Sequence, residues 1–200
     1  MKTLKLRKIL LTITCAMLLV ALTVGATFAY LTSQDTVTNT FTVGNVAITL
    51  DETDVDTAGV KDGDTRVKAN TYHLLPGHTY IKDPVVHIDA NSENCWIFVE
   101  ITNEIAPIED ATTIHDQMVA KGWTLLPGST NVYAYKEIVG KSMNIPVFDQ
   151  VKVKDDVDNT TLADYANKTV EVVAYAVQAD GFGSAAAAWN ATFGASTDGE

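Results

Sequence analysis

Beyond residue 30, the chain consists largely of short stretches in which apolar and polar residues alternate with a period of two. Residues 36–50 are the first example, with Val37, Phe41 and Val43 at odd positions separated by threonine and asparagine. Such alternation places every second side chain on one face of an extended strand. We therefore expect a strand with one buried face here, a bulge or turn at Gly44, and a second strand at 46–50.

The same pattern predicts strands along the rest of the chain. Residues 95–105 begin with a nearly continuous apolar run, which is typical of a central strand, and residues 169–178 alternate clearly. A turn sequence between two apolar runs predicts a hairpin from 123–126 and 132–139. The other expected strands are 65–72, 80–90 and 144–154.

Helices are expected to be few and short. Residues 113–121 carry apolar side chains at helical spacing and are followed by Gly122, a typical stop signal. Residues 162–166 and 184–190 predict two more helical segments. Residues 51–64 are rich in aspartate and are expected to form an exposed acidic loop, and Leu75-Pro76-Gly77 predicts a turn.

These elements predict a mainly β fold. About eight strands separated by turn signals, with two or three short inserted helices, are typical of an antiparallel jelly-roll or β-sandwich. Strands do not alternate with helices, so a parallel sheet is not expected. The 46% hydrophobic content is enough for a real core, and 200 residues suit one domain of ordinary size.

The first 29 residues have the layout of a secretory signal peptide. Four basic residues precede an apolar run from 9 to 24, and small residues follow. We expect cleavage after Ala29, which leaves Tyr30 as the first residue of a domain covering 30–194, with a flexible C-terminal tail at 195–200. The uncharged stretch 9–29 is also long enough to span a bilayer, so an uncleaved anchor is the alternative.

Charge and cysteine content fit an exported domain. The formal net charge is −11, but residues 1–29 hold four basic residues and no acidic one. The rest of the chain therefore has 10 basic against 25 acidic residues, a balance of −15, which disfavours nucleic acid as a partner. Cys95 is the one cysteine after the leader, and its apolar surroundings predict a buried thiol rather than a reactive one.

Several motifs together resemble the TasA/camelysin family. The runs are Gly25-Ala26-Thr27-Phe28-Ala29-Tyr30, Asn39-Thr40-Phe41-Thr42-Val43-Gly44-Asn45-Val46, Leu74-Leu75-Pro76-Gly77-His78-Thr79-Tyr80-Ile81-Lys82-Asp83-Pro84, Cys95-Trp96-Ile97-Phe98-Val99 and Tyr175-Ala176-Val177-Gln178-Ala179-Asp180-Gly181-Phe182. The resemblance implies cleavage by a SipW-type signal peptidase and a jelly-roll domain secreted by a Gram-positive bacterium, often into the fibres of a biofilm matrix.

The resemblance also implies a mode of assembly, in which the N-terminal segment of one subunit completes the sheet of the next. Here that segment is about 30–43, with Val37, Phe41 and Val43 as the anchors of the donated strand. An extended peptide can add to an open sheet edge through main-chain hydrogen bonds, while alternate side chains fill pockets. The alternative is that this strand pairs within its own subunit.

Catalytic motifs are absent, so we expect a non-enzyme without a catalytic, cofactor or metal site. Some family members carry a metallopeptidase label, but none of the four histidines, His73, His78, His87 and His115, starts a His-Glu-x-x-His motif. Calcium is the one cofactor considered. Its candidate oxygen ligands lie in two acidic groups, Asp51, Glu52, Asp54, Asp56, Asp62 and Asp64, and Asp155, Asp156 and Asp158, whose spacing does not match an EF-hand.

The sequence therefore favours a secreted, extracellular structural subunit that self-associates into fibres. Its other partners are the signal peptidase during export and the membrane, the latter only through an uncleaved leader. Two functions from other classes remain open. One is a camelysin-type cell-surface metallopeptidase. The other is a monomeric cell-surface binding module, although Trp96, Trp123 and Trp189 lie in apolar contexts that favour a place in the core.

Overall fold

The computed structural model describes residues 7–8, 11–18 and 44–194. The chain divides into two compact units, Met1–Thr42 and Val43–Glu200. Residues 7–8 and 11–18 are helical. Within the described ranges no helix is both long and apolar enough to cross a membrane. The expected cleavage at Ala29, the strand with Val37, Phe41 and Val43, and the tail 195–200 lie outside the described residues.

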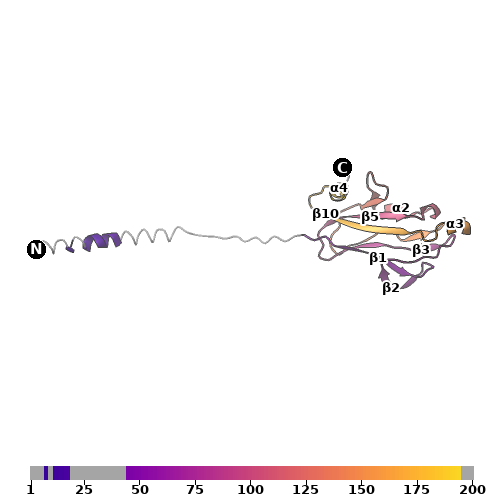
Figure 1. Cartoon of the computed structure of the whole chain (residues 1–200), viewed down its shortest axis with the longest axis horizontal. Coiled ribbons are helices and arrows are strands. Elements are labelled where there is room, and N and C mark those ends of the chain that lie inside the picture. Colours follow the sequence, from indigo (N-terminus) through magenta and orange to yellow (C-terminus); the bar gives the residue numbers. More distant parts are fainter. Residues whose placement is uncertain (1–6, 9–10, 19–43, 195–200) are drawn as a thin grey trace. The chain divides into compact units, whose positions relative to one another are not determined.

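The second unit is built from two four-stranded antiparallel sheets and a short two-stranded one (Figure 1). The first sheet has the order β2 (Lys61–Val67), β1 (Ile48–Val55), β4 (Val85–Ile88) and β8 (Asn144–Pro146). The second has the order β10 (Val170–Gln178), β5 (Cys95–Asn103), β7 (Val132–Tyr135) and β6 (Trp123–Leu125). Strand β3 (Thr79–Ile81) pairs with β9 (Gln150–Lys152). The prediction of a mainly β, antiparallel fold is confirmed.

The main core lies between the two larger sheets. Alternate residues of β5, from Cys95 through Ile97 and Val99 to Ile101, belong to one buried cluster with Val86 and other residues of the first sheet. Burying an aliphatic side chain of this size stabilises the fold by about 1.5–3 kcal/mol. Strand β5 is paired on both sides, so its predicted central position is confirmed.

A second cluster covers the other face of β5 and β10. Phe98 and Val177 are buried there beneath α4 (Ala185–Thr192), and the rings of Phe98 and Trp189 lie 5.0 Å apart. Ser184 begins this helix as its N-cap, accepting a hydrogen bond from the Ala187 amide at 3.2 Å. The helix thus covers the outside of the second sheet, away from the core between the sheets.

The remaining helices lie in connections between strands. The predicted helix at 113–121 is confirmed as α2 (Ile114–Ala120), which starts with a capping box between Thr113 and Asp116 and ends before Gly122 at φ 93°. A 3₁₀ turn, η1 (Ala106–Ile108), follows β5. Helix α3 (Asn159–Ala163) precedes β10 and has no fully buried residue.

Five local predictions differ from the structure. The acidic segment 51–64 is not a loop, because β1 continues to Val55 and β2 begins at Lys61. Asp51 of β1 forms an ion pair with Arg66 of β2, a long-range contact that the alternation of apolar residues alone cannot reveal. The strand predicted at 65–72 starts earlier and ends earlier, as β2 (Lys61–Val67). The helical turn predicted at 162–166 begins earlier, in α3, and continues as hydrogen-bonded turns in which Tyr165 donates to Leu162 and Ala166 donates to Ala163.

The predicted strands at 80–90 and 144–154 are each divided between two sheets, which raises the number of strands from about eight to ten in the described part of the chain. Pro84, which has no backbone N–H to donate, stands at the first division. At the second division Val147 and Phe148 are both fully buried, which a regular alternating strand does not allow.

Candidate strand-acceptor groove

Strand β10 forms one end of the second sheet, and its hydrogen-bonding directions follow from its neighbour. Cys95 in β5 exchanges two backbone hydrogen bonds with Val139, both 2.9 Å, so its polar groups point away from β10. In an antiparallel ladder this direction alternates from residue to residue. Odd-numbered residues of β10 therefore bond to β5, and even-numbered residues direct their N–H and C=O groups to the outer side.

That outer side is an open edge. Among the described residues, no strand pairs with β10 on the side away from β5. The open row runs over nine residues and includes the backbone groups of Val172, Ala174 and Ala176. Buried sheets rarely leave such a row unpaired, because each unpaired polar group loses free energy when it is removed from water.

The side chains along this edge are incompletely covered. Val170, Val172, Ala174 and Ala176 all pack against the core between the sheets, yet each is only half-buried. The partners of the last three across the ladder, Ile101, Val99 and Ile97, are buried. Because these residues face inward but keep contact with solvent, the core is open along the side of β10.

A groove of about 1100 Å³ lies beside this edge. Val170 and Val172 form part of its wall, whereas Ala174 and Ala176 do not line it. The groove therefore lies beside the beginning of β10 and does not extend to its alanines. Its other apolar lining comes from β1, from the segment 67–75 and from α3 and the turn after it, and includes Leu50, Leu74, Leu162 and Tyr165.

Strand β1 forms part of the opposite wall and is itself half unpaired. Its pairing with β2 starts at Glu52, so on that side residues 48–51 have no strand partner among the described residues. The side chain of Lys68 donates a hydrogen bond to the carbonyl oxygen of Leu50. A lysine placed on an exposed edge discourages pairing with another strand. The Lys68 side chain thus occupies part of the free backbone edge of β1. The outward backbone groups of β10 have no such side-chain partner among the described residues.

The floor of the groove contains a buried ion pair. Lys82 Nζ lies 2.8 Å from Glu52 Oε2, with side-chain exposures of 13% and 6%, and Asn70 donates to the other carboxylate oxygen at 3.0 Å. Tyr72 donates to the carbonyl oxygen of Ile81 at 3.0 Å, and burial together with the nearby Glu52 charge raises the pKa of its hydroxyl. These groups are satisfied within the fold, so the floor does not offer unpaired ligands.

The other sheet edges are protected against pairing. Strand β2 is almost wholly exposed and carries Lys61, Asp62, Asp64 and Arg66. Strands β6 and β8 are three residues long, and β8 includes Pro146. Charge, shortness and proline are common means of blocking edge-to-edge association. Among these four end strands, β10 alone presents a long open edge with a single charged residue, Glu171.

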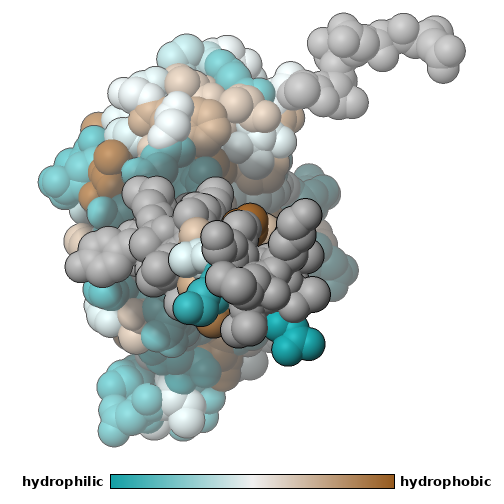
Figure 2. Space-filling view, turned by 90° about the vertical axis from the view of Figure 1, so that its left-hand side faces the viewer, coloured by the Kyte–Doolittle hydropathy of each residue, from teal (hydrophilic) through white to brown (hydrophobic). Residues whose placement is uncertain are grey.

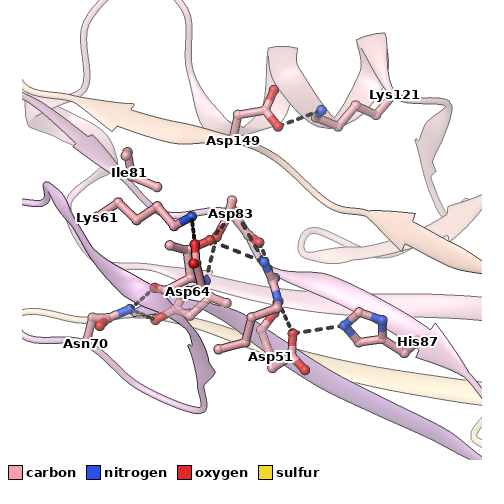
Figure 3. Close-up of polar contacts among 12 residues, drawn as sticks. Asp51, Lys61, Asp64, Asn70, Ile81, Asp83, His87, Lys121 and Asp149 are labelled. Atoms are coloured by element: carbon pink, nitrogen blue, oxygen red, sulfur yellow. Dashed lines mark hydrogen bonds and ion pairs between the residues drawn. The ribbon is translucent and has the colours of Figure 1, made fainter. Parts of the chain in front are cut away.

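A line of polar side chains crosses the outer face of the first sheet (Figure 3). Arg66 of β2 bonds to Asp51 of β1, which lies 2.9 Å from His87 Nε2 of β4, and His87 Nδ1 lies 2.7 Å from Asn144 Oδ1 of β8. Burial tends to raise the pKa of Asp51, but its bonds to Arg66 and His87 outweigh this and lower it. This line connects all four strands of the sheet.

The four histidines do not converge on a metal site. His78 Nε2 contacts the carbonyl oxygen of Ala58 at 2.8 Å, and His115 Nδ1 contacts the hydroxyl of Tyr133 at 2.9 Å. His87 belongs to the polar line on the first sheet, and His73 is exposed. Within the part of the chain that the structure describes, no three His, Cys, Asp or Glu side chains are grouped as metal ligands. These residues therefore do not fit the zinc site of a metallopeptidase.

The acidic residues considered for calcium mostly have partners of their own. Asp51 bonds to Arg66, Glu52 to Lys82 and Asp64 to Lys61. Asp158 caps α3 by accepting a hydrogen bond from the Thr161 amide at 2.7 Å. Most of these carboxylates are therefore committed to cations or backbone donors that stabilise the fold.

Cys95 is fully buried, as predicted, and burial raises the pKa of its thiol to about 11 despite a hydrogen bond with Ser92. Trp123 is buried as predicted, whereas Trp189 of α4 and Trp96, which packs in the same cluster, are half-buried. On the face shown in Figure 2, hydrophilic residues predominate and hydrophobic ones appear as separate spots, without a continuous apolar patch.

The predicted donor anchors Val37, Phe41 and Val43 and the cleavage residues Ala29 and Tyr30 lie outside the described residues, so those predictions stay predictions. Sequence analysis missed the groove and the open edge of β10. The one available signal was the run 170–177, which is apolar on both faces and has Glu171 as its only charge. That pattern also fits a central strand, so it could not identify an edge.

Comparison with known proteins gives one match. Residues 3–79 match the model of a family described as camelysin metallo-endopeptidase. The matched region contains the first two motifs quoted above and the start of the third, while those at 95–99 and 175–182 lie beyond it. Searches of curated proteins and of solved structures found no significant match. Over residues 3–79 the chain is therefore similar to the camelysin/TasA family, which supports the resemblance seen in its motifs.

Proposed function

We propose that this protein is a secreted structural subunit that polymerises by donating the strand at 36–43 to the open edge of β10 in the next copy. The observation that carries the proposal is the long, half-covered edge of β10 beside the groove, in a strand with one charged residue. A protein that remained monomeric would gain nothing from this edge and would be exposed to uncontrolled aggregation.

The donated segment has the chemistry that such an edge accepts. An added strand would hydrogen-bond to the outward backbone groups of Val172, Ala174 and Ala176 and would cover their half-buried side chains. Val37, Phe41 and Val43 alternate with polar residues, so one face of the segment is apolar. The apolar face would turn toward the core and the threonines toward solvent.

Export belongs to the same proposal. The leader-like order of residues 1–29 and the similarity of residues 3–79 to a family of extracellular or cell-surface proteins support secretion, with cleavage after Ala29. N-terminal sequencing of the protein recovered from culture medium tests this directly, and a chain that retains Met1 and remains with the membranes would contradict it.

The assembly is tested by removing the donor. The chain that begins at Tyr30 is expected to form filaments visible by electron microscopy, whereas the same chain lacking 30–40 is expected to remain a folded monomer by light scattering and circular dichroism. Normal filaments from the shortened chain would exclude strand donation by this segment.

The acceptor edge is tested by Ala174→Pro. This change removes one outward N–H and leaves every ladder bond to β5 intact, which an edge strand tolerates. It is expected to block filament growth without unfolding the domain. The matched control is Val173→Pro, which removes an N–H bonded to β5 and is expected to destabilise the fold by about 3 kcal/mol or more. Unimpaired filaments from Ala174→Pro would exclude β10 as the acceptor.

The name of the matched family favours a second function, a cell-surface metallopeptidase. The separate placement of the four histidines argues against it, and we propose that the chain is not an enzyme. Purified protein incubated with casein, with and without a chelator, decides between the two. Chelator-sensitive cleavage would overturn this part of the proposal, and a persistent monomer that binds one cell-wall component would favour the surface-binding alternative.

A further inference from the structure

The floor of the groove brings together an amine, a carboxylate and a primary amide. Glu52 of β1, Asn70 after β2 and Lys82 between β3 and β4 come from three separate parts of the chain. Lys82 Nζ lies 2.8 Å from Glu52 Oε2, and Asn70 Nδ2 donates to Glu52 Oε1 at 3.0 Å. The amine of Lys82 and the amide of Asn70 are therefore held at the two oxygen atoms of one carboxylate.

The amide of Asn70 is fixed in orientation by the backbone of β1. Its Nδ2 also donates to the carbonyl oxygen of Thr53 at 2.8 Å, and its Oδ1 accepts from the backbone N–H of Val55 at 3.1 Å. Acceptors beside the nitrogen and a donor beside the oxygen define which amide atom is which. The N–H of Val55 also stabilises negative charge on Oδ1, which makes the Cγ carbon more open to attack by a nucleophile.

The site is largely shielded from water. The side chains of Lys82 and Glu52 are 13% and 6% exposed, and the ring of Tyr72 lies 5.9 Å from Lys82 Nζ. Removal from water penalises the charged form of an ammonium–carboxylate pair, which lowers the cost of passing a proton between its members. The uncharged amine produced in this way is the form of a lysine that acts as a nucleophile.

We propose that Lys82 and Asn70 of the same chain become joined by an isopeptide bond, with Glu52 as the proton carrier. Glu52 takes a proton from the ammonium of Lys82, and the lone pair left on Nζ attacks Cγ of Asn70. The Nζ–Cγ bond forms, and the Cγ–Nδ2 bond breaks with its electron pair remaining on Nδ2.

The protons balance without another reactant. Nδ2 receives the proton held by Glu52 and leaves as ammonia. A second proton passes from Nζ through Glu52 to this ammonia, which departs along the groove as an ammonium ion and leaves the Glu52 carboxylate as it was. One ammonium and one primary amide are thus converted into one secondary amide and one ammonium ion.

The bond would close the loop from Asn70 to Lys82, which contributes Tyr72, Leu74 and Tyr80 to the lining of the groove. Both cysteines of the chain are free, so the domain has no disulfide to restrict its unfolded state. A covalent link between distant residues stabilises a fold by this restriction. The inference does not depend on strand donation, because all three residues belong to one copy.

Tryptic peptide mapping tests the link. No lysine or arginine lies between Asn70 and Lys82, so an unlinked chain releases the peptide 69–82. Trypsin does not cleave after an acylated lysine, so a linked chain releases 69–121 instead, lighter than its sequence by one ammonia, about 17 Da. Cyclisation of Asn70 to a succinimide causes the same loss of mass but leaves Lys82 cleavable, so peptide length separates the two modifications.

Two variants and one internal control make the test specific. Glu52→Gln keeps both reacting residues and removes the proton carrier, whereas Lys82→Arg keeps a cation beside Glu52 but has no amine to acylate. Asn131 is the internal control, because its Nδ2 donates to Glu100 Oε1 at 3.0 Å and no lysine pairs with that carboxylate among the described residues. The peptide 122–136, which contains it, should keep its ordinary mass.

The full chain, purified in mild detergent and folded by circular dichroism, is denatured and digested. The expected main product is the linked 69–121, at least tenfold less abundant in Glu52→Gln and absent in Lys82→Arg. The peptide 69–82 of unchanged mass as the main product of the folded wild-type chain would overturn the proposal. Equal yields of the linked peptide from the wild type and Glu52→Gln would overturn the role of Glu52. Because the wild-type chain alone can overturn the bond, a variant that fails to fold does not remove the test.

Discussion

At the scale of single residues, buried ionisable groups carry the clearest consequences. Glu109 is only 6% exposed and lies where η1 leads toward α2, with the Ile114 amide donating to its carboxylate at 3.4 Å. Burial raises its pKa, and hydrogen bonds from Asn103 and Ile114 only partly oppose this. A raised pKa means that the folded state favours the neutral form of the carboxyl. Its negative charge therefore opposes folding at neutral pH.

Glu109→Gln is therefore expected to stabilise the domain at neutral pH, on the order of 1 kcal/mol in the free energy of unfolding. The native stability contribution of this group is present below the unfolded pKa and is lost as pH rises through the folded pKa. Urea unfolding at several pH values measures the difference, which should shrink in acid. Glu137→Gln, at an exposed position, is the control, and an equal gain there would contradict the role of burial.

Cys95 gives a second prediction at this scale. Its thiol is fully inaccessible and burial raises its pKa to about 11, so it should not react with a thiol reagent at mildly alkaline pH while the chain beginning at Tyr30 is folded. Addition of denaturant should release one thiol per chain. Rapid modification of the folded protein, measured by absorbance, would show that β5 opens readily.

At the scale of secondary-structure elements, β2 is held to the sandwich by polar contacts. Its residues are almost wholly exposed, and the guanidinium of Arg66 reaches Asp51, Thr53 and Asp83. An edge strand that buries little apolar area depends on such contacts for its position.

Arg66→Met is expected to release β2 while the rest of the sandwich remains folded. Hydrogen exchange followed by mass spectrometry should show faster exchange in residues 61–67 and unchanged protection in β5, whose partners are elsewhere. Asp51 has a lowered pKa, so the contacts it makes should also weaken as pH falls through that value. Lys61→Met, whose partner Asp64 is fully exposed, is the control and should have little effect.

At the scale of the whole molecule, charge opposes the assembly that the edge of β10 favours. Beyond the leader the formal balance is −15, so two copies repel each other on approach. Raising the ionic strength from about 0.01 to about 0.15 M shortens the Debye length from about 30 to about 8 Å. Filament growth followed by light scattering should accelerate over this range, and slower growth at higher salt would show that attraction between charges controls the contact.

Assembly should also stabilise the subunit. Three donated apolar side chains contribute about 1.5–3 kcal/mol each before the cost of association. The Tm of the filament is therefore expected to exceed that of the chain lacking 30–40 and to depend on protein concentration. Calorimetry at two concentrations measures this. Equal and concentration-independent Tm values would mean that the groove is not filled.

The sequence by itself determined most of the elements. Apolar periodicity located β5, β10 and the hairpin of β6 and β7, and apolar residues at helical spacing with a following glycine located α2. It failed at 51–64, where acidic residues form paired strands, since the partners Asp51 and Arg66 lie 15 residues apart. The sequence also did not show that 80–90 and 144–154 are each divided between two sheets. The first part of 80–90 pairs with the last part of 144–154, and the remaining parts pair with each other in another sheet, so the division depends on long-range pairing.

Tertiary structure alone decided the candidate site. The alternation of 170–178 is the same whether a strand is central or terminal, and only the strand order shows that β10 has a partner on one side. The groove combines β1, the segment 67–75, α3 and β10, which are distant in sequence. Backbone hydrogen-bond directions, sheet order and cavity shape arise from long-range pairing, so local patterns determine which residues form strands but not which strand edge remains open.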